Sequence, residues 1–181
     1  MRLTPILLSA FGCSAFLFSQ QTLATSVNEL KAIIECRTNS DGYQAFADDY
    51  ENELKNLGWK RQDDPNQPFI YIYKNSTPIK VFDKSTTEIG LTGQAVVAIY
   101  RYREVEPLAK KYGFTQHPAL VDFNYFRGEK LIETEPATED SFTIHKKLML
   151  SELPGKSPMS ILGCNYEPDR AEMENLLNFA E

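Results

Sequence analysis

The two cysteines Cys36 and Cys164 limit the fold of this chain more strongly than any other feature of its sequence. The third cysteine, Cys13, lies in an apolar N-terminal segment with the pattern of a removable export signal. An exported chain with an even number of remaining cysteines favours a disulfide, so we predict a Cys36–Cys164 bond. In the chain-entropy model, a bond that closes so long a loop contributes about 4–5 kcal/mol. A redox-active pair is disfavoured, because neither cysteine belongs to a C-x-x-C motif or adjoins a histidine or lysine.

Residues 1–24 have the pattern of a secretory signal peptide. Arg2 supplies the positive start, Leu3 to Phe18 is mostly apolar, and Thr22-Leu23-Ala24 ends in the small residues of a cleavage site. We therefore predict cleavage after Ala24 and an exported protein, periplasmic or extracellular. The apolar run is too short for a confident membrane span, which needs about 20 residues, and no stable span is expected in the mature chain. Lipidation of Cys13 is an alternative that the flanking sequence fits poorly.

Removal of residues 1–24 leaves residues 25–181, which are enough for a single α+β domain with its own hydrophobic core. The full chain has 19 basic and 25 acidic residues. The signal segment contains one basic residue and no acidic residue, so the mature chain has a net charge of −7. This charge repels the phosphates of nucleic acids and favours a cationic partner.

The stretch Gly42–Trp59 predicts one amphipathic helix. Its apolar side chains fall on one face and its carboxylates on the other, and Gly58 stands where a left-handed residue ends a helix. Further helices are expected at Thr25–Cys36, Glu104–Tyr112 and Asp169–Ala180.

Strand-like sequence with short turns follows each of the two middle helices. The expected strands are Phe69–Lys74, Ile79–Phe82, Thr87–Tyr102, Val121–Arg127, Lys130–Thr134, Phe142–Leu150 and Pro158–Tyr166. Asn75-Ser76-Thr77-Pro78 is expected to be a turn, and Gly90 and Gly93 indicate a bulge or bend within the third strand. These elements predict an α+β fold, with an antiparallel sheet of about 6–8 strands and helices on one face.

The ends of the two middle helices resemble each other. Leu54 to Trp59 and Ala109 to Phe114 both run through a polar or basic pair, a large residue, glycine and an aromatic residue, and the offset between them is 55 positions. This similarity indicates two helix-then-meander halves. Ordinary helix capping can produce the same pattern by chance, so a structural repeat remains one of two alternatives.

Catalytic and metal-binding patterns are weak in this sequence. His117 and His145 lack the sequence context of a catalytic triad, and no zinc-ligand spacing occurs. The carboxylate pairs Asp48-Asp49, Asp63-Asp64 and Glu133/Glu135 are interpreted as solvated surface. We therefore predict no catalytic residue, no metal site and no cofactor.

The aromatic side chains suggest a binding face more than any other feature does. They recur at alternate positions on expected strands, as Tyr71 and Tyr73, Tyr100 and Tyr102, and Phe123 and Tyr125. If the helices cover the face of Ile70, Ile72, Val97 and Ile99, the tyrosines stand on the opposite face, with Arg101 close by. Exposed tyrosines are typical of protein interfaces. The alternative is that these rings are half-buried strand residues.

These features favour an exported, non-enzymatic binding protein, of an inhibitor-like or envelope-associated kind, whose partner is another protein. One alternative is an envelope hydrolase that uses acidic residues, which requires two convergent carboxylates with one raised pKa. The other is a carrier of a small ligand or lipid, which requires a closed apolar cavity.

Overall fold

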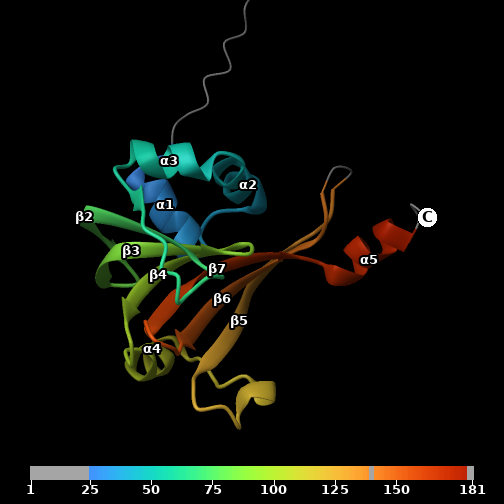
Figure 1. The fold of residues 1–181 in the computed structure, drawn as a ribbon. Helices are drawn as coiled ribbons and strands as arrows, with labels where there is room; N and C mark the ends of the chain where they lie inside the picture. Colours follow the sequence, from blue (N-terminus) through green and yellow to red (C-terminus); the bar gives the residue numbers. More distant parts are fainter. Residues whose placement is uncertain (1–24, 139–140, 179–181) are drawn as a thin grey trace, which may run out of the picture.

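The computed structural model describes residues 25–138 and 141–178, so the predicted signal segment lies outside the described residues. The described chain forms a seven-stranded sheet with five α-helices (Figure 1). Along the chain the elements are α1 (Val27–Ile34), α2 (Ser40–Asp48), α3 (Tyr50–Asn56), β1 (Lys60–Arg61), β2 (Tyr71–Val81), β3 (Lys84–Thr92), β4 (Ala95–Arg101), α4 (Val105–Tyr112), the 3-10 turn η1 (Pro118–Leu120), β5 (Arg127–Glu135), β6 (Ile144–Leu153), β7 (Met159–Pro168) and α5 (Arg170–Asn178).

The sheet consists of two meanders that meet in its middle. Its strand order is β1-β2-β3-β4-β7-β6-β5, and all neighbouring strands are antiparallel. Helix α3 precedes the meander β2-β3-β4, and α4 precedes the meander β5-β6-β7. The predicted α+β class is confirmed, and both halves have the predicted helix-then-meander order. Within residues 25–138 and 141–178, no helix has the length and apolar character that crossing a membrane requires.

The two middle helices end in the same way. The backbone N–H of Trp59 donates to the Leu54 carbonyl, and that of Phe114 donates to the Ala109 carbonyl, each at 2.9 Å. Gly58 (φ 83°) and Gly113 (φ 69°) take the left-handed conformation that this cap requires. In both helices this cap buries the aromatic residue that follows the glycine. The 55-residue offset between the two stretches of sequence therefore relates structurally equivalent positions.

Most of the core lies on the face of the sheet that carries Ile89, Val96, Leu150 and Leu162, here called the helix face. Figure 1 shows α1–α3 gathered at one end of the sheet and α4 at the other. All four helices contribute buried side chains to this core, among them Leu30, Ile33, Phe46, Leu54 and Leu108. The opposite face, here called the far face, carries a smaller apolar cluster that includes Ile72, Val97 and Ile161.

The predicted helix Gly42–Trp59 is two helices. The chain leaves helical geometry at Asp49 (φ −139°), which separates α2 from α3. The Asp49 carboxylate accepts a hydrogen bond from the Asn52 side chain at 2.6 Å. Short polar side chains form such local bonds in competition with a continuous helix, which explains the break.

Two strand boundaries also differ from the prediction. The expected turn Asn75–Pro78 lies inside β2, where the pairing register with β3 shifts between Lys74 and Ile79. The expected strand Thr87–Tyr102 is a hairpin, because Gly93 (φ 56°) turns the chain between β3 and β4. Gly90 forms no bulge. It leaves space for the Ile70 side chain, which a Cβ at this position would meet.

The expected strand Val121–Arg127 is a loop that follows η1, and β5 begins at Arg127. The Gln116 side chain holds this loop by donating to the carbonyls of Leu120 (2.8 Å) and Tyr125 (3.1 Å) and by accepting from the N–H of Arg127 (2.9 Å). These side-chain hydrogen bonds take the place of the backbone hydrogen bonds between strands that the alternating sequence pattern predicts for this segment.

Candidate functional site

The predicted aromatic face does not exist as one surface. Tyr73 and Tyr100 are only 3% and 7% exposed and belong to the helix-face core. The Tyr100 hydroxyl donates to the Val81 carbonyl at 3.2 Å, and the Tyr73 ring packs edge-on against Tyr50. The prediction is therefore wrong for these two residues, because the helices cover the tyrosine side of the sheet and not the isoleucine side.

A loop, not a helix, covers the far face. The segment 62–70 crosses it, and its Gln67 side chain donates to the Ser157 carbonyl at 2.9 Å. Ile70 packs into the space above Gly90 and joins the apolar cluster of this face. Arg101 is exposed at the end of β4, where it lines a depression of about 900 Å³. Of the six predicted aromatic residues, only Tyr100 lines this depression.

The carboxylates around that depression are paired. Asp63 accepts from Arg61 at 2.8 Å, Glu88 from Lys74 at 2.8 Å, and Glu104 is paired with Lys84. Hydrogen bonds from Ser157 and Asn66 hold the pKa of Asp64 below its usual range. A hydrolase needs one carboxyl group whose pKa is raised, so this arrangement gives the hydrolase alternative no support.

The remaining predicted aromatics lie in two separate hollows on the helix face. The first, here called the Tyr71 hollow, has a volume of about 370 Å³. It lies between α2–α3, the Pro68-Phe69 end of the loop and the β3–β4 turn. Its aromatic lining consists of Tyr43, Phe46, Tyr50, Phe69 and Tyr71.

Phe69 and Tyr71 are the open side of the Tyr71 hollow, with exposed fractions of 88% and 46%. The guanidinium of Arg61 lies 4.2 Å from the centroid of the Tyr71 ring and pairs with Glu51 at 3.1 Å, which holds the ring in place. On the inner side, Tyr43 stacks on the buried Tyr166 ring with the centroids 4.1 Å apart. The lining is therefore pre-formed on one side and open on the other.

Two carboxylates stand close to this aromatic lining in the sequence. Asp48 and Asp49 are exposed and lie in sequence between the lining residues Ala47 and Tyr50. Asp48 accepts a hydrogen bond from the Gln44 side chain and Asp49 from the Asn52 side chain, each at 2.6 Å. Both donors are neutral amides, so these bonds do not compensate the negative charges. Neither carboxylate is among the residues that line the hollow, so both add negative charge to the surface around it, which favours a positively charged ligand.

The second hollow, here called the Phe123 hollow, has a volume of about 580 Å³. It lies between the start of α4, the loop after η1 and β6, and it brings together three of the six predicted aromatics, Tyr102, Phe123 and Tyr125. Phe123 and Val121 are 55% and 65% exposed. Glu152 closes its inner side by accepting from the N–H of Phe126 at 2.9 Å.

The sequence pattern does not indicate that Phe69 is exposed or that Tyr43 and Tyr50 line a hollow. It predicts Phe69 within a strand, which begins at Tyr71, and it predicts the two tyrosines on the buried face of a helix. A signal was available, because Pro68 directly before Phe69 disfavours a regular strand at this point.

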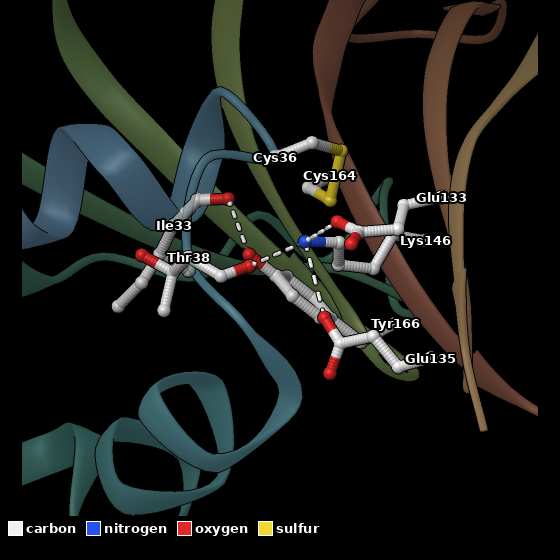
Figure 2. The surroundings of a disulfide bond; sticks show 8 residues. All are labelled: Ile33, Cys36, Thr38, Glu133, Glu135, Lys146, Cys164 and Tyr166. Carbon is white, nitrogen blue, oxygen red and sulfur yellow. Dashed lines mark hydrogen bonds and ion pairs between the residues drawn. A yellow bond between two sulfur atoms is a disulfide. The ribbon is translucent and has the colours of Figure 1, made fainter. Parts of the chain in front are cut away.

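A cluster of mostly buried polar groups lies beside the Cys36–Cys164 disulfide, which the structure contains as predicted (Figure 2). The ammonium of Lys146, whose side chain is 5% exposed, contacts Glu133 at 2.6 Å and Glu135 at 3.1 Å and donates to the Thr38 carbonyl at 3.0 Å. Ser40 donates to Glu135 through its backbone N–H (2.8 Å) and its hydroxyl (2.6 Å). Burial alone would lower the pKa of Lys146, but its carboxylate partners raise it. Apart from Glu135 Oε1, which has an ion-pair contact with Lys146 but no hydrogen bond, the groups of this cluster bond to one another, and we interpret the cluster as structural.

The histidines have local partners as well. His145 shares hydrogen bonds with Thr134 and Asp169, and the His117 ring accepts from the N–H of Ala119. Within the described ranges, no group of three or more histidine, cysteine, aspartate or glutamate side chains is placed to hold a metal ion. Compared with known proteins, the chain matches no family model, no curated protein and no solved structure.

Proposed function

We propose that this chain is an exported, non-enzymatic binding protein that holds a cationic, partly apolar segment of another protein in the Tyr71 hollow. The observation that carries this proposal is Phe69, a large apolar side chain that is 88% exposed at the edge of a hollow lined by further aromatic rings. Exposure of such a ring to water is unfavourable, and a partner that covers it gains the corresponding hydrophobic free energy.

The charges around the Tyr71 hollow select the kind of partner. Asp48 and Asp49 add exposed negative charge at the end of α2, outside the lining itself, and residues 25–181 have a net charge of −7. Aromatic rings bind cations over their faces, as Tyr71 already does with Arg61 at 4.2 Å. A lysine- or arginine-containing segment with apolar side chains fits both features.

The expected binding can be measured with a defined probe, a short peptide of alternating lysine and leucine with one tryptophan. We expect the Phe69→Ala substitution to weaken binding of this peptide about thirtyfold, the loss typical of an aromatic hot spot. The substitution removes few native contacts, because the ring is almost fully exposed. Fluorescence titration of the protein that begins at Thr25 would give the dissociation constants.

Three comparisons define this experiment. Leu131→Ala removes a side chain that is 57% exposed on β5, outside both hollows, and should leave the affinity unchanged. The Asp48→Asn/Asp49→Asn variant should weaken binding and reduce its dependence on salt. A peptide with glutamate in place of lysine should not bind. Equal binding of both peptides, or equal losses in Phe69→Ala and Leu131→Ala, would contradict the proposal.

Export and cleavage after Ala24 are part of the same proposal. The disulfide suits an oxidising compartment. In addition, the backbone nitrogen of Thr25 lies 2.6 Å from the Glu53 carboxylate, directly before the capping box of Ser26 and Glu29 that begins α1. Cleavage after Ala24 would convert this nitrogen into an ammonium group and the hydrogen bond into an ion pair.

We therefore predict that a free amino group at Thr25 stabilises the mature chain through Glu53. Acetylation of this amino group and the Glu53→Gln substitution should each lower the free energy of unfolding by about 0.5–1 kcal/mol, as for a partly exposed ion pair. Because both changes remove the same pair, their combination should cost little more than either alone. Urea denaturation of the four forms tests this, and fully additive losses would show that no such pair forms.

A further inference from the structure

The two hollows occupy equivalent positions in the two halves of the fold. Each is lined by the phenylalanine and the tyrosine of a Phe-x-Tyr sequence, Phe69 and Tyr71 in one and Phe123 and Tyr125 in the other. In both halves this sequence ends the connection between the helix and its meander, at or just before the first strand. In both it presents an exposed phenylalanine.

The helices contribute to the hollows in matching ways. Tyr50 begins α3 and lines the Tyr71 hollow, while Val105 begins α4 and lines the Phe123 hollow. Ala47 and Tyr102 form a second such pair. Both pairs are separated by 55 residues, the same offset that relates the two helix caps. The second strand of each meander completes the hollow, through Thr92 in β3 and Glu152 in β6.

The sheet explains why the hollows lie apart. Because β4 and β7 pair antiparallel at the centre, with Ala98 opposite Leu162, the two halves are related by an approximate two-fold rotation through the sheet. Such a rotation keeps both hollows on the helix face but places them at opposite ends of the strands. One peptide segment in each hollow would therefore not collide with the other.

The Phe123 hollow also favours a cationic ligand. Glu106 and Glu152 line it and Asp122 belongs to its loop, against the single positive charge of Arg103. The guanidinium of Arg103 lies 5.9 Å from the centroid of the Tyr102 ring. This excess of carboxylates matches a basic peptide and would repel an anionic lipid surface.

We infer that the Phe123 hollow is a second site for the same class of ligand, a cationic and partly apolar peptide segment, and that the protein is bivalent. This inference rests on the proposed function of the Tyr71 hollow. A partner that carries two such segments, as a repeat or as a dimer, would gain avidity, since the second contact forms at a high effective concentration.

The number of lysine–leucine peptides bound per protein tests the inference, measured by isothermal titration calorimetry. We expect two peptides on the unchanged protein, one on Phe69→Ala, one on Phe123→Ala and none on the double variant. The Phe123 side chain is 55% exposed, so its loss should leave the melting temperature close to that of the matched variant Leu131→Ala, which should bind two peptides.

The outcomes separate the two proposals. One peptide on the unchanged protein, lost in Phe69→Ala and retained in Phe123→Ala, would overturn bivalence and leave the Tyr71 hollow as the binding site. No peptide on any form would overturn both proposals. Binding to vesicles that contain anionic lipid, weakened by Phe123→Ala, would identify the loop of Phe123 as a membrane contact and also overturn the inference.

Discussion

Replacement of Cys36 and Cys164 by alanine is expected to lower the free energy of unfolding by about 4 kcal/mol. The two residues are 128 positions apart, and the bond restricts the unfolded chain far more than the folded one. The bond joins the end of α1 to the middle of β7, so it closes a loop that contains most of the domain. Without the bond, the conformational entropy of the unfolded chain increases. Urea denaturation, with the loss read from the shift in midpoint, measures the effect.

Reduction of the unchanged protein provides the matched control. It removes the bond but keeps both sulfur atoms, which belong to residues that are only 5% and 0% exposed, so any extra loss in the alanine variant comes from packing. We expect the reduced protein and the alanine variant each to show most of the decrease of about 4 kcal/mol in the free energy of unfolding. A loss below about 1 kcal/mol in the reduced protein would mean that its unfolded chain keeps the two cysteines close together.

Local signals in the sequence predicted much of this fold. The disulfide was predicted from two cysteines and an expected export signal, and the helix-then-meander halves were predicted from apolar periodicity and turn residues. The strongest match is the pair of caps at Gly58 and Gly113, because a left-handed glycine followed by a buried aromatic depends on only six consecutive residues. Local patterns of this kind are independent of how distant segments pack.

The orientation of the sheet could not be predicted in the same way. In β4 both sets of alternating side chains are apolar, so alternation cannot tell which set the helices cover. The outcome depends on distant contacts, such as the Tyr100 hydroxyl with Val81 and the packing of Ile70 above Gly90. As a result the predicted aromatic face was divided. Tyr73 and Tyr100 lie in the core, and the other four predicted aromatic rings line the two hollows.

Lys146→Met is expected to lower the free energy of unfolding by about 3–5 kcal/mol, the usual cost of removing one partner from a buried ion pair. The change leaves Glu135, whose side chain is 18% exposed, without its cation, and it leaves the Thr38 carbonyl without a donor. Lys147→Met is the matched control. The Lys147 ammonium lies on the opposite side of β6, and among the described residues it pairs only with Glu167, which is partly exposed. We therefore expect the Lys147→Met substitution to lower the free energy of unfolding by less than about 1 kcal/mol.

The dependence on pH distinguishes this ion pair from simple packing. Burial alone would raise the pKa of Glu135, but hydrogen bonds from Ser40 and the adjacent Lys146 ammonium hold it below its ordinary value. A carboxyl group with a lowered pKa stabilises the folded state above its unfolded pKa, about 4.3, and loses that contribution as the pH falls through the folded value. The difference in stability between the unchanged protein and Lys146→Met should therefore be largest near pH 7 and narrow below about pH 4. In Lys146→Met/Glu135→Gln no buried carboxylate is left without its cation, because the other partner, Glu133, is 57% exposed, so part of the loss near pH 7 should be recovered. A difference that stays constant from neutral to acid pH, with no recovery in the double variant, would mean that Lys146 stabilises the fold through the packing of its aliphatic chain and not through its charge.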